Sequence, residues 1–264
     1  MNEFMLNSLE LSKNNYLDLL LDIYPMEEEP RRSIPDHKKV EINCFCNSRD
    51  KLSLILTLLD LELFPIKDSY IAFLKRSNDP ERVLRNNPIT IDRLGDRLLS
   101  MGYNEIIEEC SKPKETNRKI GPMFKNWVQR LSSRYYITTD QNEILNSENG
   151  IIILNTSDDD MKKFARNYLG YTSDKGLDFI AKKDNNYIVG ETKFLTDFGG
   201  HQNAQLNDAM AIFNNNFNNN VTPIAILDGV VWIEGKNYQY NTLLSNRDKF
   251  IFSALYLPYF LDRI

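Results

Sequence analysis

Residues 176–194, GLDFIAKKDNNYIVGETKF, combine the patterns of two strands and a turn. They contain two runs rich in apolar and β-branched residues, 176–183 and 187–194, which is the composition of half-buried strands. Between them stands Asp184-Asn185-Asn186, and Asp and Asn favour tight turns because they tolerate left-handed backbone conformations. The pattern therefore predicts a β-hairpin.

Three charged side chains, Asp178, Glu191 and Lys193, are expected on one face of this hairpin. A loop of Asp184-Asn185 places Asp178 opposite Glu191, whereas a loop of Asn185-Asn186 places it opposite Lys193. Glu191 and Lys193 share a face in either register, because side chains alternate along a strand. Opposed Cβ atoms lie about 5 Å apart, so two carboxylates could reach one hard cation such as Mg²⁺, whose oxygen ligands sit at about 2.1 Å. Unpaired charges are costly on apolar strands, and a metal with a scissile phosphate would provide their partners.

The rest of the chain divides into a helical half and a mixed half. Apolar residues recur at spacings of three and four up to about Cys110, and prolines cut this region into short helices. The elements expected beyond Gly150 are strands at 151–154 and 223–233, the second with a turn at Asp228-Gly229 inside it, helices at 158–169 and 202–213, and a last helix at 248–260. The pattern predicts an α/β (α+β) fold, with a mixed-sheet core flanked by helices over 112–264 and a mostly helical region over 1–111.

The composition favours a soluble cytoplasmic protein with an anionic partner. At 26% charged residues, no stretch approaches the roughly 20 apolar residues of a membrane span, and the N-terminus lacks a secretory pattern. Three cysteines argue against a disulfide framework. The net charge is -5, yet residues 111–134 carry seven lysines and arginines against one glutamate, a local charge of 7 - 1 = +6 that leaves -11 for the remainder. A positive segment in an acidic protein indicates an anionic partner such as DNA.

Leu177-Asp178, followed by Glu191-Thr192-Lys193, resembles the motif of the PD-(D/E)XK nucleases, and residues 112–235 resemble a type II restriction endonuclease. The resemblance implies a restriction-endonuclease-like core in which Asp178, Glu191 and the backbone carbonyl of Thr192 hold Mg²⁺. Lys193 would orient the attacking water and offset the charge that builds on phosphorus. The implied activity is Mg²⁺-dependent, sequence-specific cleavage of double-stranded DNA, giving 5′-phosphate and 3′-hydroxyl ends.

Two departures from the family pattern affect this interpretation. Leu177 stands where the name-giving proline would be, which is a frequent absence in the family. Glu115 is the only glutamate in the helix expected to precede the core, so the number of metal ions stays open. The resemblance also implies a homodimer on a short palindromic site, because two-fold symmetry matches a palindrome and one active site cuts one strand.

Two segments are expected to contact DNA. Asn and Gln pair with adenine edges in the major groove, a helix N-terminus can hold a phosphate, and lysine and arginine bind the DNA backbone. The candidate residues are Asn117, Arg118, Lys119 and Lys125 in the basic segment, which is expected to be helical from about 115 to 135, and Gly200, His201, Gln202, Asn203 and Gln205 after the second strand of the hairpin.

Several alternatives stay open. A structure-selective repair nuclease could use the same core, and a non-catalytic DNA-binding protein could retain the hairpin without cutting. The helical region could supply a dimer surface or additional base contacts. Asp158, Asp159 and Asp160 are interpreted as acids that stabilise a helix N-terminus, and not as metal ligands. Ordinary thiols are favoured over a zinc site for the cysteines, because Cys44-x-Cys46 lacks the usual zinc spacing.

Overall fold

The predicted hairpin consists of β3 (Phe179–Lys183) and β4 (Asn186–Leu195), joined by Asp184-Asn185. Lys183 pairs with Asn186 and Phe179 pairs with Gly190, so Asp178 lies opposite Glu191, as the first of the two registers predicts. Asp184 has a φ of 53°, in the left-handed region that a two-residue hairpin turn requires. Local turn chemistry therefore fixes which charged residues face one another.

In this computed structural model the hairpin forms the centre of a six-stranded sheet with the order β1-β2-β3-β4-β5-β6. The outer strands are β1 (Tyr136–Thr138), β2 (Ile151–Leu154), β5 (Val221–Gly229) and β6 (Ile251–Phe252). The β2–β3 and β3–β4 pairs are antiparallel and the other pairs are parallel. The sheet is therefore mixed, and the predicted α+β class is confirmed.

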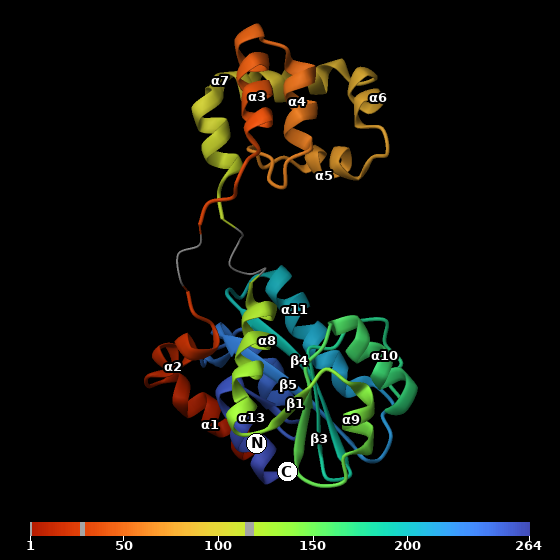
Figure 1. The fold of residues 1–264 in the computed structure, drawn as a ribbon. Helices are drawn as coiled ribbons and strands as arrows, with labels where there is room; N and C mark the ends of the chain where they lie inside the picture. Colours follow the sequence, from red (N-terminus) through yellow and green to blue (C-terminus); the bar gives the residue numbers. More distant parts are fainter. Residues whose placement is uncertain (1, 27–29, 114–118) are drawn as a thin grey trace. The chain divides into compact units, whose positions relative to one another are not determined.

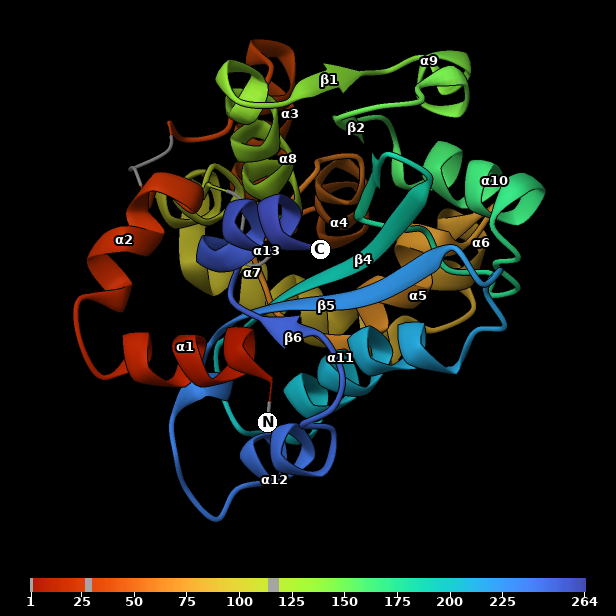
Figure 2. The same ribbon diagram turned by 90° about the horizontal axis from the view of Figure 1, so that it is seen from below.

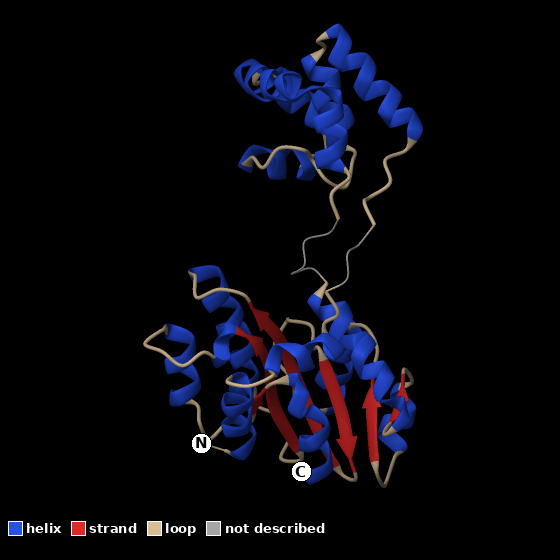
Figure 3. Cartoon of the chain, turned by 90° about the vertical axis from the view of Figure 1, so that its left-hand side faces the viewer, coloured by secondary structure: helices blue, strands red, loops and turns tan. Residues whose placement is uncertain are grey.

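Helices cover both faces of the sheet (Figure 3). On one face, α8 (Ile120–Arg130) and α13 (Leu257–Arg263) pack over the side chains that include Phe179 and Ile188. On the other face, α9 (Gln141–Asn146) and α10 (Asp158–Tyr168) pack over those that include Ile180 and Val189. Since side chains alternate, Glu191 and Lys193 point to the same side as Val189, the side that α10 covers.

The remaining helices of this unit lie at the β5–β6 end of the sheet. Here α11 (Gly200–Met210) contacts β4 and β5, and α12 (Tyr238–Ser245) contacts α11. From the N-terminal part of the chain, α1 (Glu3–Ser12) lies beside β6, and α2 (Tyr16–Ile23) contacts α8 (Figure 2). Sequence analysis anticipated neither α12 nor the short strand β1.

The predicted last helix over 248–260 is wrong in its first half. Ile251 and Phe252 form β6, paired with Ala225 and Ile226 of β5, and the helix α13 begins only at Leu257. An apolar run of this length fits a buried strand as well as a buried helix, and only pairing with β5 distinguishes them. The turn predicted at Asp228-Gly229 is confirmed, because β5 ends at Gly229, whose φ of 90° turns the chain and where a β-carbon would lie 2.0 Å from the Leu195 carbonyl oxygen; the strand does not continue to 233.

A second unit is purely helical. It contains α3 (Asp36–Ser48), α4 (Lys51–Leu59), α5 (Ser69–Arg76), α6 (Pro80–Arg85) and α7 (Pro88–Cys110). Its own core includes Leu54, Leu58, Leu84, Leu94 and Leu98, all fully buried. Gly102, whose φ of 74° is not helical, kinks α7 and divides it into two parts, which match the two helices predicted over 91–101 and 105–110.

The structure describes residues 2–26, 30–113 and 119–264, which cluster into two units (Figure 1). The sheet unit comprises residues 1–27 and 115–264, and the helical unit comprises residues 28–114. The helical unit is thus an insertion between α2 and α8. Sequence analysis instead assigned α1 and α2 to one helical region over 1–111. Within the described ranges, no helix is both long and apolar enough to cross a membrane.

Candidate active site

Four predicted residues come together on the α10 side of the sheet. The Lys193 Nζ lies 3.1 Å from Glu191 Oε2 and 3.4 Å from Asp178 Oδ2, and it donates to the Thr192 carbonyl oxygen at 3.0 Å. The Thr192 N–H donates to Asp178 Oδ2 at 2.8 Å. One ammonium is therefore surrounded by two carboxylates and a carbonyl, an all-oxygen acceptor set of the kind that hard cations prefer.

Burial perturbs the protonation of this cluster. The Glu191 side chain is 8% exposed, and its burial raises the pKa of the carboxyl to about 8. The negative charge of Asp178 contributes to the increase, and the Lys193 ammonium opposes it. Burial also opposes the charge of Lys193, but the attraction of Asp178 and Glu191 outweighs it and leaves the ammonium pKa above its usual value. At neutral pH, Glu191 therefore retains a proton that a bound cation would displace.

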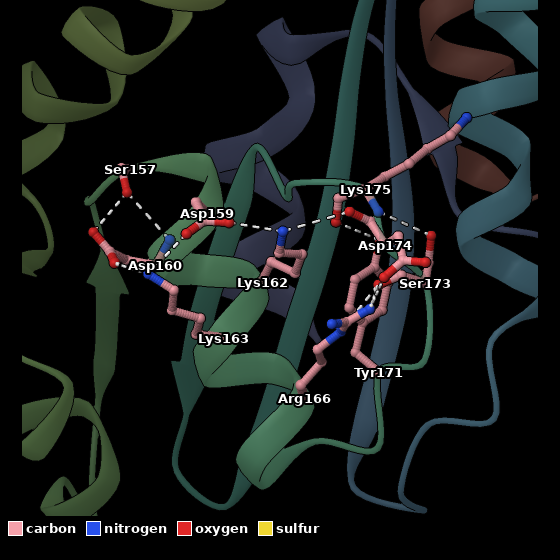
Figure 4. Close-up of polar contacts among 10 residues, drawn as sticks. All are labelled: Ser157, Asp159, Asp160, Lys162, Lys163, Arg166, Tyr171, Ser173, Asp174 and Lys175. Carbon is pink, nitrogen blue, oxygen red and sulfur yellow. Dashed lines mark hydrogen bonds and ion pairs between the residues drawn. The ribbon is translucent and has the colours of Figure 1, made fainter.

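The segment ahead of Asp178 is fixed by α10. The Arg166 guanidinium donates to the Ser173 carbonyl at 2.8 Å and pairs with Asp174 Oδ1 at 2.6 Å (Figure 4). The Leu177 N–H then donates to the Asp158 carbonyl oxygen at 3.2 Å, and the Asp178 N–H donates to the Gly190 carbonyl at 3.3 Å. These bonds hold Asp178 at the hairpin edge although it precedes the first residue of β3.

A crevice of about 360 Å³ adjoins Asp178. Its walls are Gly121, Pro122, Phe124, Lys125 and Asn126 of α8, together with Asp158, Asp178 and Thr192. Lys125 Nζ pairs with Asp158 Oδ1 at 2.5 Å and donates to the Thr156 carbonyl at 2.7 Å. The crevice therefore presents a fixed ammonium beside the catalytic candidates.

Asp158 is the residue of this site that sequence analysis set aside. Its neighbours Asp159 and Asp160 behave as predicted, because they pair with Lys162 and Lys163 in the first turns of α10 (Figure 4). Asp158 instead lines the crevice with Asp178. Three consecutive aspartates carry no sequence signal that separates the one facing the crevice from the two on the helix surface.

The structure offers no competing metal site among residues 2–26, 30–113 and 119–264. No group of three or more His, Cys, Asp or Glu side chains gathers in these ranges. Cys44 is exposed, Cys46 is half-buried and Cys110 is buried, and all three are free thiols. Asp178, Glu191 and the Thr192 carbonyl bring together oxygen atoms of the kind that hard cations prefer.

The basic segment is less available to DNA than its charge count suggests. Its helix, α8, spans 120–130 and ends earlier than the predicted 135, while residues 115–118, which include Asn117 and Arg118, lie outside the described residues. Lys125 pairs with Asp158, Arg130 with Asp22 and Arg134 with Asp262. Lys119 directly precedes the helix. Acids that are distant in sequence thus neutralise much of the predicted positive patch.

The amide-rich segment after β4 also differs from the prediction. The Gln202 side chain is buried at 7% exposure and both of its amide atoms bond to Thr196, at 3.2 and 3.1 Å, so it cannot read a base edge. Asn203 Oδ1 accepts from Gln239 Nε2 at 3.2 Å. The remaining candidates lie at the start of α11, where Gly200 and His201 are exposed and Gln205 lies 3.1 Å from the His201 ring. Gln202 and Asn203 therefore brace the loop instead of extending from it.

Comparison with known proteins gives one match. The family model described as Tsp45I type II restriction enzyme matches residues 2–264, essentially the whole chain. Neither the curated proteins nor the solved structures contain a match.

Proposed function

We propose that the chain, which belongs to the Tsp45I type II restriction enzyme family, uses Asp178, Glu191 and Lys193 to cleave double-stranded DNA with Mg²⁺. Membership of the family makes the chain a site-specific deoxyribonuclease. The observation that carries the proposed chemistry is the meeting of two carboxylates with Lys193 at 3.1 and 3.4 Å beside a crevice. This is the arrangement expected of a PD-(D/E)XK nuclease.

Asp178, Glu191 and the Thr192 carbonyl would hold the metal. When bound, Mg²⁺ supplies Lewis-acid stabilisation of a phosphate oxygen and lowers the pKa of a water molecule. Glu191 gives up its proton as it becomes a ligand. Lys193, already charged, orients the attacking water and offsets the negative charge that builds on the phosphate. Water attacks phosphorus, the bond to the 3′-oxygen breaks, and that oxygen takes a proton, leaving 5′-phosphate and 3′-hydroxyl ends.

The proposed DNA contacts of the sheet unit lie at the crevice and at the start of α11. Lys125 of α8 presents its ammonium in the crevice, and Lys119 directly precedes the same helix. Gly200 and His201 are exposed at the start of α11, where free N–H groups favour a phosphate. Each active site would cut one strand, so we expect a homodimer on a short palindromic site. We expect the enzyme to act in the cytoplasm, where foreign DNA arrives.

Digestion of long unmethylated DNA tests the proposal. Purified protein is incubated with Mg²⁺ or with EDTA, beside the variants Asp178→Asn and Glu191→Ala, and the products are separated by size. Discrete bands are expected only for the wild type with Mg²⁺, while both variants keep DNA binding. Glu148→Gln is the matched control, because Glu148 is an exposed acid of the same unit.

Two results would contradict the proposal. Full cleavage by Asp178→Asn in Mg²⁺ would show that the Asp178 carboxylate is not needed for cleavage. A smear confined to branched or single-stranded substrates would indicate the structure-selective repair nuclease instead.

A further inference from the structure

Unpaired positive charge is concentrated in the helical unit. Within the described ranges, the lysines and arginines whose side chains form no ion pair, hydrogen bond or ring contact are Arg49, Lys67, Arg76, Arg82 and Arg97 of the helical unit, and Lys236 and Arg247 of the sheet unit. A cation without an internal partner keeps its full attraction for phosphate. Unpaired charge therefore favours an anion-binding surface on the helical unit over one on α8, where Lys125 and Arg130 are already paired.

One of these arginines, Arg76, borders an aromatic groove, and Arg97, whose charge also helps to lower the pKa of Asp68, lies near a residue that contacts the groove wall. The groove, about 440 Å³, lies between α5, α6 and α7 and is lined by residues that include Tyr70, Phe73, Leu84 and Asn87; we call it the α5–α7 groove. Arg76 lines the adjoining hollow together with Phe73. Arg97 lies one turn along α7 from Arg93, whose guanidinium sits 5.0 Å from the centre of the Tyr70 ring.

The rim of the groove is unusually apolar for an exposed surface. Phe73 is 67% exposed and Tyr70 is 57% exposed, while Ile89, at the start of α7, is 82% exposed. Large apolar side chains gathered around a groove mark a surface that a partner covers. Asn87 adds a side-chain amide, whose Nδ2 donates to the Val83 carbonyl at 2.7 Å.

The charges at the groove decide which partner fits. A second copy of the chain on the same surface would press Arg76 and Arg97 against a surface that carries the same two positive charges, because a two-fold interface pairs one patch with itself. Such like charges repel each other. DNA supplies the opposite charge along its whole backbone, and its base edges and sugars offer apolar surface for aromatic side chains.

We propose that the α5–α7 groove is a contact surface for the substrate DNA, with Arg76 and Arg97 on phosphates and Tyr70 and Phe73 against base edges and sugars. The inference rests on the proposed function, because it assigns part of the recognition of the same substrate to the inserted unit. Residues on this surface act on affinity and sequence choice, not on the chemical step.

The test measures DNA binding by the full-length chain against salt concentration. All variants carry Glu191→Ala, which prevents cleavage in the presence of Mg²⁺. Each phosphate contact contributes about 0.9 to the slope of log affinity against log salt, so Arg76→Ala with Arg97→Ala should lower that slope by roughly 2. Phe73→Ala should weaken binding about tenfold or more, the range of one good base contact, with little change in slope.

Lys39→Ala is the matched control for charge. Lys39 is a cation of the helical unit on α3, and it is already paired with Asp36 at 2.9 Å. Its loss removes the same formal charge, and the slope should stay unchanged. Phe73, Arg76 and Arg97 are exposed, Lys39 is half-buried and Glu191 is buried, so circular dichroism checks that the parent and each variant fold.

The outcomes separate the groove from the function on which it rests. An unchanged slope for the double arginine variant, with normal DNA binding by the parent, overturns the groove proposal and leaves the nuclease assignment standing. A Phe73→Ala variant that changes the sedimentation coefficient but not DNA affinity identifies a dimer surface, which also overturns it. A parent that neither binds DNA nor, with Glu191 restored, cleaves it overturns both proposals.

Discussion

Replacing Glu191 by glutamine should stabilise the metal-free protein while abolishing cleavage. The pKa of Glu191 is raised from 4.5 to about 8, mainly by burial, so the folded chain holds this proton more tightly than the unfolded chain does. The direction of the pH dependence follows from the linkage between proton binding and folding. The contribution to stability is complete below pH 4.5, falls as the pH rises, and is lost above pH 8. Glutamine resembles the protonated acid in shape and carries no charge, so it avoids this loss.

The size of the effect follows from the width of that pH interval. Each pH unit between the two pKa values is worth about 1.4 kcal/mol, which gives about 4 kcal/mol at pH 8, where the folded acid is half ionised. At pH 5 the same calculation leaves less than about 1 kcal/mol. For a unit of this size, 1 kcal/mol moves the melting temperature by roughly 2–4 °C, so Glu191→Gln should melt about 10 °C higher at pH 8.

Thermal unfolding in EDTA at pH 5 and pH 8 tests this reasoning, with Glu148→Gln as the exposed control. The gain should be large at pH 8, small at pH 5 and absent in the control. Added Mg²⁺ should raise the melting temperature of the wild type by mass action, but not that of Glu191→Gln. Equal melting of wild type and Glu191→Gln at pH 8 would refute the view that ionisation of the buried Glu191 costs stability despite its pairing with Lys193.

Two further substitutions test other features of the sheet unit. Tyr24 donates to the buried carboxylate of Asp228 at 3.0 Å, and burial raises the Asp228 pKa to about 6. Tyr24→Phe should therefore lower the free energy of unfolding by about 1.5–3 kcal/mol at pH 8, and by less at pH 5, where Asp228 is protonated. Urea titrations that give equal losses of stability at both pH values would contradict this. Asp158→Asn should lower kcat/KM on plasmid DNA by about tenfold or more, because it releases Lys125 in the crevice. Asp159→Asn should leave kcat/KM unchanged, and equal effects of the two substitutions would assign Asp158 to helix stability alone.

The hairpin could be predicted because its determinants are local. The turn residues Asp184-Asn185 fix the register, and alternation then places Asp178, Glu191 and Lys193 on one face without reference to the rest of the chain. The strand β6 could not be predicted in this way. Ile251 and Phe252 are extended because they pair with β5, about 25 residues earlier in the sequence, and nothing in their own composition separates a strand from a helix.

The charge pattern in the sequence overstated the surface open to DNA for the same reason, because distant segments supply the partners. The basic segment seems open to DNA when only neighbours in sequence are considered, yet Arg130 and Arg134 pair with Asp22 and Asp262, more than 100 residues away. Gln202 seemed suited to read a base, but its amide is consumed by Thr196 within the same loop. A polar side chain contributes to recognition only if folding leaves it unpaired, and tertiary structure decides that question.

The insertion of the helical unit explains how weakly charged surfaces could still hold DNA. Residues 28–114 interrupt the sheet unit between α2 and α8, and α8 supplies Lys125 and other walls of the crevice. The chain therefore returns from the helical unit directly into the helix that borders the proposed cleavage site. If both proposed surfaces bind DNA, binding at one makes binding at the other intramolecular, because the two units belong to one chain. Neither the α5–α7 groove nor the crevice then needs a dense positive patch to hold DNA. This agrees with the small number of cations without a partner among the described residues of either unit.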